Sequence, residues 1–135
     1  MKTKIFLASI IAVTALISAC EKGPGKGGTS TITGIVTVHE YNRDFTIARD
    51  TFPGAKEDVY LIYGDDPVYG DKFEANYDGR YEFKYLREGS YKVYAYSKDP
   101  TKNYDLTSEE IPIIREVEIT GKDQTIEVPE IIIIK

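Results

Sequence analysis

Side chains that commonly carry out catalysis are scarce in this sequence of 135 residues. His39 is the only histidine and Cys20 is the only cysteine. A Ser-His-Asp triad would have to use His39, which lies in no recognisable nucleophile motif. A zinc site would have one imidazole to draw on and, for the reason given below, no free thiol. The residue inventory therefore predicts no enzyme activity and no bound cofactor.

Acidic side chains offer one candidate metal site. Asp65, Asp66 and Asp71 bring three carboxylates into one short segment. Hard oxygen ligands of this kind are the ones that calcium prefers. The segment lacks the EF-hand spacing and ends without a bidentate glutamate. A solvated turn is therefore the favoured interpretation, and a calcium site is the alternative.

Aromatic residues are the most suggestive surface feature of the sequence. Alternation along two expected strands points four apolar or aromatic side chains away from the core: Tyr60, Ile62, Tyr94 and Tyr96. Exposed tyrosines can stack on a glycan or anchor a protein ligand. Cross-strand pairing that only stabilises the sheet is the simpler interpretation. These four residues are nevertheless the candidate ligand-binding surface.

Residues 1–20 have the organisation of a secretory leader. Lys2 and Lys4 precede an apolar run from Ile5 to Ile17, which is shorter than the ~20 residues that span a bilayer as a helix. The ending Leu16-Ile17-Ser18-Ala19-Cys20 resembles the lipobox of bacterial lipoproteins. This resemblance implies a signal peptide at 1–19 and palmitate-type acylation of Cys20, which would leave no thiol for disulfides, metals or catalysis.

Residues 20–30 are expected to form the lipidated cysteine and a flexible Gly-rich tether. Ten such residues span about 17 Å on average, which keeps the domain near the membrane. Position 21 is Glu rather than the Asp that favours inner-membrane retention in enterobacterial lipoproteins, so an outer-membrane location is favoured. The Gly-rich segment resembles those of Bacteroidota surface lipoproteins. The sequence does not distinguish between the periplasmic face and the cell-surface face of that membrane.

Turn chemistry and alternation organise residues 31–135 as one domain of short strands. The expected strands are Thr31–Tyr41, Val59–Tyr63, Lys72–Tyr77, Arg80–Leu86, Tyr91–Tyr96, Ile113–Ile119 and Gln124–Ile134. Asp78-Gly79 predicts a tight hairpin turn, and Asn42–Asp58 is expected to be a long loop. The pattern predicts an all-β, seven-stranded antiparallel two-sheet sandwich.

One spacing within this domain resembles a known family. The residues that carry it are Asp78-Gly79, Tyr81, Phe83, Leu86, Gly89, Tyr91, Val93 and Ala95. This pattern resembles the transthyretin-like (prealbumin-like) β-sandwiches, which include carboxypeptidase-regulatory-like domains. Further matches are Gly34-Ile35-Val36, Pro53-Gly54-Ala55 and Gln124–Val128. The resemblance implies a prealbumin-like, Ig-like fold and a structural module, and it implies no activity.

The chain ends in an unusually apolar strand. Ile131–Ile134 loses the alternation of a half-buried strand, as a strand buried on both faces would. Burial within the domain is the favoured interpretation, because an exposed edge of this kind invites edge-to-edge pairing. Strand addition to a partner is the alternative.

Net charge limits the range of partners. The chain has a formal net charge of −5, which becomes −7 once the leader with Lys2 and Lys4 is removed. An acidic surface repels nucleic acid. The sequence therefore favours a lipid-anchored, non-catalytic binding or adhesion module for an envelope glycan or protein. A structural or assembly subunit of an outer-membrane complex is the second hypothesis, and the oligomeric state stays open.

Overall fold

The computed structural model describes residues 22–101 and 109–135, and within them it contains β-strands and no helix. None of these residues therefore belongs to a helix that could span a bilayer. The strands of the described part are β1 (Lys26–Tyr41), β2 (Ala48–Pro53), β3 (Asp58–Tyr63), β4 (Asp71–Glu74), β5 (Arg80–Leu86), β6 (Gly89–Lys98), β7 (Glu110–Ile119), β8 (Thr125–Glu127) and β9 (Ile131–Ile134).

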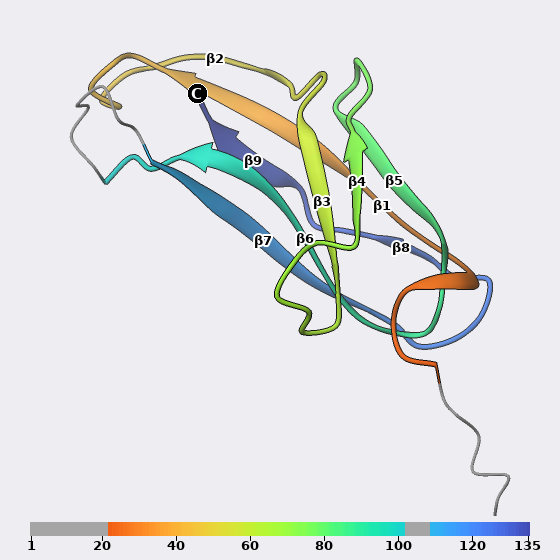
Figure 1. Ribbon diagram of the computed structural model, residues 1–135. Helices are drawn as coiled ribbons and strands as arrows, with labels where there is room; N and C mark the ends of the chain where they lie inside the picture. Colours follow the sequence, from red (N-terminus) through yellow and green to blue (C-terminus); the bar gives the residue numbers. More distant parts are fainter. Residues whose placement is uncertain (1–21, 102–108) are drawn as a thin grey trace, which may run out of the picture.

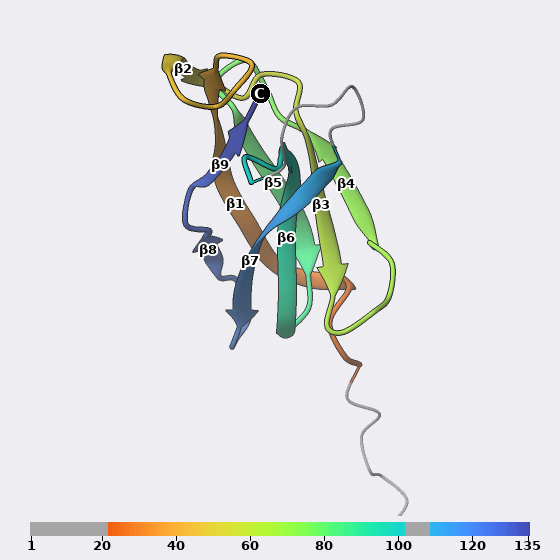
Figure 2. The ribbon, with the colours of Figure 1, turned by 90° about the vertical axis from the view of Figure 1, so that its left-hand side faces the viewer.

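The strands form two sheets that lie face to face (Figures 1 and 2). One sheet has four strands in the order β4-β3-β6-β7, and the other has five strands built on β1. Along one side, β1 pairs antiparallel with β5 over its first part and with β2 over its second. Along the other side it pairs with β8 and β9, which run parallel to it. β1 is thus the central strand of its sheet.

The all-β expectation is confirmed, but the expectation of seven antiparallel strands is wrong. The described residues form nine strands, and two of them are parallel to β1. The additional strand β2 falls within the expected loop Asn42–Asp58, where every residue of Ala48–Pro53 is exposed, so alternation could not indicate it. The expected strand Gln124–Ile134 is split into β8 and β9 around Pro129, because proline cannot donate to a ladder.

The Asp78-Gly79 turn joins the two sheets and does not close a hairpin. β4 before it pairs with β3, whereas β5 after it pairs with β1. The side chain of Asn76 accepts hydrogen bonds from the amides of Asp78 and Arg80, both at 3.0 Å, and Gly79 has a φ of 74°. A turn whose backbone amides are hydrogen-bonded by one of its own side chains does not need the strands on either side of it to pair with each other. The next connection, at Arg87 and Glu88, likewise passes from one sheet to the other.

The core lies between the sheets and matches the inward parities expected for most strands. Its fully buried members come from both sheets: Ile32, Val36, Val38, Val59, Leu61, Tyr81, Phe83, Leu86, Tyr91, Val93, Ala95, Ile119, Ile131 and Ile133. Leu86 stays buried after a break in alternation because Tyr85 has a φ of 61°. A positive φ at one residue reorients the strand and returns the next side chain to the core.

The terminal isoleucines lie within the domain. Ile131 and Ile133 have no exposed surface, whereas 39% of Ile132 is exposed. β9 is therefore buried on one face only. The expectation that it is buried on both faces is wrong, because its side chains alternate between the core and solvent. The pairing of β9 with β1 supplies the partner that the apolar run required.

Candidate functional site

Tyr60, Tyr94 and Tyr96 form a cluster on the outer face of the four-stranded sheet. Tyr60 on β3 stands directly opposite Tyr94 on β6 in the antiparallel register. Their rings stack with centroids 5.0 Å apart and an interplanar angle of 15°. Tyr96 places its ring edge-on to both, at 5.6 Å from Tyr60 and 5.5 Å from Tyr94. Tyr94 and Tyr96 lie on one face of β6, and the register places Tyr60 of β3 beside them, so the three rings form one continuous aromatic surface.

A fourth ring, that of Tyr69, joins this cluster from the loop between β3 and β4. Its centroid lies 4.9 Å from that of Tyr60 in an edge-on arrangement. The amide of Gly70 donates to the Leu61 carbonyl at 2.8 Å, which turns the loop back over the sheet. A Cβ on Gly70 would lie 2.2 Å from the ring of Tyr63, so only glycine allows this close approach. Sequence reasoning missed Tyr69 because a loop residue has no alternation to assign its direction.

Exposure divides the four rings, called the tyrosine surface from here on, into a base and a rim. Tyr94 is only 8% exposed because Tyr60 and Tyr96 cover it, and Tyr60 is half-buried. Tyr69 and Tyr96 are 49% and 40% exposed. Tyr94 points away from the core as expected, but the expectation that its ring is freely accessible is wrong, because neighbouring rings cover it. The rim residues are the ones that can touch a ligand.

Ile62, the fourth expected member, contributes no ring contact to the tyrosine surface. It is half-buried and stands opposite Lys92 on β6. The Lys92 ammonium lies 3.4 Å from the Asp65 carboxylate, so this end of the strand pair is charged. On the neighbouring edge strand, Ile114 stands opposite Tyr94 and is 45% exposed. Apolar surface on this face therefore extends over β7.

Burial favours the protonated form of the Tyr60 and Tyr94 hydroxyls. Burial raises the pKa of Tyr60, and the Asp58 carboxylate raises it further. Burial and then the hydrogen bond with Tyr96 raise the pKa of Tyr94 to about 12. Beside them, the Lys72 ammonium lies 3.4 Å from Asp58. The surface thus offers flat apolar rings, neutral hydroxyls and one exposed ion pair.

The candidate calcium ligands are not gathered into a site. Asp71 lies 2.8 Å from the ammonium of Lys26 and accepts the amide of Lys72 at 2.9 Å. Asp65 faces Lys92 instead. Across residues 22–101 and 109–135, no group of three or more histidine, cysteine, aspartate or glutamate side chains could hold a metal ion.

His39, the only histidine, lies apart from the tyrosine surface. His39 is a half-buried residue of β1 that pairs with Thr51 and Ile134 in the other sheet. Cys20, the expected lipidation site, lies outside the described residues.

A separate pocket of about 830 Å³ lies where the described chain begins. It is lined by the first residues of the fold and by the β5–β6 and β7–β8 connections, and its charged residues are Lys22, Arg87, Glu88, Glu118 and Lys122. None of the four rings of the tyrosine surface contributes to it. Within the described residues, this pocket and the tyrosine surface are therefore separate places at which other molecules could bind.

Comparisons with known proteins add little to this geometry. No family model matches the chain, and no curated protein matches it. Among solved structures, a Pseudomonas aeruginosa protein described as a candidate carbohydrate-binding protein is 12% identical, covers 82% of this chain and 91% of its own, and has a TM-score of 0.48. An (S)-allantoin synthase is 18% identical, covers 78% of this chain and 42% of its own, and has a TM-score of 0.42. Similarity this low assigns no function.

Proposed function

We propose that the protein is a non-catalytic binding module that holds a carbohydrate ligand on the tyrosine surface. The observation that carries this proposal is the contact of four aromatic rings on one sheet face, with two of them 40% and 49% exposed at the rim. A soluble domain seldom leaves several large rings together in water without a ligand for them. The described residues beside the rings match no recognisable nucleophile and general-base motif, which favours binding without catalysis.

The chemistry of the surface suits a sugar in two respects. A pyranose ring presents an apolar C–H face that packs flat on an aromatic side chain, and tyrosine supplies such a face with a polar tip. The hydroxyls of the rim residues Tyr69 and Tyr96 and the Asp58–Lys72 ion pair supply donors and acceptors beside the rings. Sugar hydroxyls need such partners because an unpaired polar group loses free energy when it leaves water.

The leader sequence supports a location for this module. We propose that Cys20 is acylated and holds the protein in a bacterial outer membrane, because the ending Leu16–Cys20 has the lipobox pattern and Glu21 follows it. Several acyl chains at ~0.8 kcal/mol per buried methylene give a stable anchor. A prealbumin-like topology remains a prediction from the strand motifs. The alternative function is that of a structural or assembly subunit of an envelope complex.

Glycan-array binding by the full-length, detergent-solubilised protein tests the proposed function. Tyr96→Ala and Tyr69→Ala should each weaken glycan binding about tenfold or more, because each removes an exposed ring that packs on the sugar. The matched control is Tyr77→Ala, which removes a ring that is 80% exposed and lies outside the surface.

Two outcomes would contradict this proposal. Equal losses in all three variants would show that the effect is not specific to the tyrosine surface. Absence of glycan binding, together with retention of one envelope protein in pull-downs that Tyr96→Ala abolishes, would favour the assembly alternative.

A further inference from the structure

Residues 23–29, which belong to the expected tether, lie bound to the rest of the fold. Arg87, between β5 and β6, holds its backbone at three points. Its Nε donates to the Gly23 carbonyl at 2.7 Å, its amide donates to the Gly25 carbonyl at 2.9 Å, and its guanidinium also donates to the Lys26 carbonyl. Residues 23–26 of the expected flexible tether therefore follow one path along the domain.

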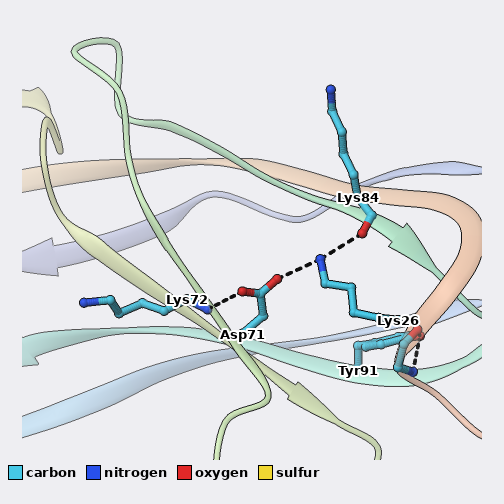
Figure 3. Close-up of polar contacts among 6 residues, drawn as sticks. Lys26, Asp71, Lys72, Lys84 and Tyr91 are labelled. Atoms are coloured by element: carbon cyan, nitrogen blue, oxygen red, sulfur yellow. Dashed lines mark hydrogen bonds and ion pairs between the residues drawn. The ribbon is translucent and has the colours of Figure 1, made fainter.

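Tyr91 and Lys26 attach the segment to further strands (Figure 3). The Tyr91 hydroxyl accepts the Gly25 amide at 2.9 Å and donates to the Arg87 carbonyl at 2.6 Å. The Lys26 ammonium lies 2.8 Å from the Asp71 carboxylate and donates to the Lys84 carbonyl at 3.0 Å. Tyr91 is 1% exposed, so release of the segment would remove a hydrogen-bond partner from a buried hydroxyl.

Glycines in the domain leave room for this segment. A Cβ on Gly89 would lie 2.8 Å from Pro24, and one on Gly64 would lie 3.2 Å from it. A Cβ on Gly28 would lie 2.0 Å from the Leu86 carbonyl oxygen. Real Cβ atoms do not approach so closely as the shortest of these distances, and close backbone approach is one use of glycine. Glycines in the segment and in the loops beside it thus allow the segment to pack closely against the domain.

The bound segment shortens the link between the anchor site and the fold. Only Glu21 and Lys22 lie between Cys20 and Gly23, the first residue held by Arg87. Three residue steps reach at most about 11 Å, compared with an average of about 17 Å for a free ten-residue tether. A link this short restricts which end of the domain can face the lipid.

The pocket of about 830 Å³ lies at this same end. Lys22, Arg87 and Lys122 line it with positive charge, and Glu88 and Glu118 line it with negative charge. This mixture complements a zwitterionic phospholipid headgroup, whose phosphate would face the cations and whose ammonium would face the carboxylates. The chain continues from this pocket toward Cys20, so the headgroups beside the anchor are its nearest possible occupants.

We infer that the end of the molecule carrying this pocket is its bilayer-facing surface, held in fixed orientation by the segment 23–29 and in contact with zwitterionic phospholipid headgroups. The inference rests on the proposed acylation of Cys20 and does not depend on the tyrosine surface. In this orientation the loop after β1 lies at the opposite end of the domain, away from the membrane (Figures 1 and 2).

Single fluorophores on the full-length acylated protein test the orientation. The acylated chain has no other thiol. Asp66→Cys places one label in the loop between β3 and β4, whose Gly64 lies beside Pro24, and Asp44→Cys places one in the loop after β1. The protein is inserted into phosphatidylcholine and phosphatidylethanolamine vesicles that contain a headgroup nitroxide lipid. We expect nitroxide quenching to be severalfold stronger at residue 66 than at residue 44. A long Gly-Ser linker inserted after Lys22 should remove this contrast.

Charge variants test the headgroup contact. Lys22→Gln combined with Lys122→Gln should lower quenching of the residue 66 label, whereas the matched pair Lys56→Gln with Lys84→Gln, outside the pocket, should not. Equal quenching of the two labels in vesicle-bound protein would overturn the orientation, and no effect of the pocket variants would overturn the headgroup contact. Failure of the wild type to float with vesicles, or flotation of Cys20→Ser, would refute the anchor itself.

Discussion

Tyr94 and Tyr96 lie two residues apart on β6 and point to the same face, yet one is 8% exposed and the other 40%. Alternation assigns the face of a strand residue, but it cannot say what covers the side chain. The cover on Tyr94 is Tyr60 from β3 together with Tyr96, and Tyr69 then closes over Tyr60 from a loop. At the scale of single residues, the site is therefore defined by contacts between strands and a loop.

The shifted pKa of Tyr94 predicts a dependence of stability on pH. Its pKa is raised to about 12 in the folded protein from 10.0 for the free side chain, so the unfolded chain loses this proton first as pH rises. The free energy of unfolding should therefore fall between about pH 10 and pH 12.

Urea denaturation at a series of alkaline pH values measures this effect. Tyr94→Phe should show a shallower fall than the wild type, and some fall should remain because Tyr60, Tyr63 and Tyr91 also have raised pKa values. If the free energy of unfolding falls equally steeply with pH in the two proteins, folding does not raise the pKa of Tyr94.

At the scale of elements, β9 shows how much one face of a short strand contributes. Ile131 and Ile133 are fully buried against the core, while Ile132 between them is 39% exposed. The strand gains its backbone partners from β1 in parallel register. The final apolar residues therefore belong to the folding unit.

Neighbouring isoleucines on β9 make a matched pair of variants. Ile133→Ala should lower the free energy of unfolding by about 2–5 kcal/mol, because it removes buried methylenes and leaves a cavity. Ile132→Ala should cost about 1 kcal/mol or less, since its side chain is partly in water. Because the chain contains no tryptophan, urea titration followed by far-ultraviolet circular dichroism can compare the two variants. Similar losses in both would contradict the one-sided burial of β9.

The sequence indicates the strands that alternate, and it is silent on those that do not. The inward faces of β1, β3, β5 and β6 are visible as two-residue periods because each has one buried and one exposed face. β2 is exposed on both faces and carries no such signal. The Asp78-Gly79 turn was expected to close a hairpin because Asp-Gly commonly does, but the Asn76 side chain supports a sharp turn between sheets instead.

The site was predictable in part for the same reason. Tyr60 and Tyr96 follow from strand parity, whereas Tyr69 depends on a loop that Gly70 brings back against Tyr63. The bound segment 23–29 was also hidden, because glycine and proline composition is the same for a free linker and for a chain that packs closely on a surface. The partners Arg87 and Tyr91 lie more than 60 positions away in sequence.

At the scale of the whole molecule, the fold begins before the boundary at residue 31 that composition suggests. Ser30 is 1% exposed, its hydroxyl donates to the Gly121 carbonyl at 3.1 Å, and it accepts the Gln124 amide at 3.1 Å. Together with the contacts of Arg87, these bonds connect the start of the described chain to both sheets. Residues 23–30 are therefore part of the domain.

A truncation series measures the contribution of these residues. A chain that starts at Thr31 should unfold at lower urea concentration than one that starts at Lys22, with a loss of at least ~2 kcal/mol from several hydrogen bonds at ~0.5–1.5 kcal/mol each. Arg87→Ala should destabilise the longer chain and have little effect on the shorter one, because the partners of its side chain are absent there. Equal effects of Arg87→Ala on both chains would contradict the described contacts.

The position of β1 also determines how the domain responds to mechanical tension. A pull on the N-terminus while a ligand is held on the other sheet acts along β1, which is hydrogen-bonded to β2, β5, β8 and β9. Hydrogen bonds across the antiparallel pairs lie perpendicular to the strand, so this force loads many of them in shear at once and does not unzip them singly. Under the proposed N-terminal anchoring, the force would therefore enter the domain at the strand that has the most strand partners in its sheet.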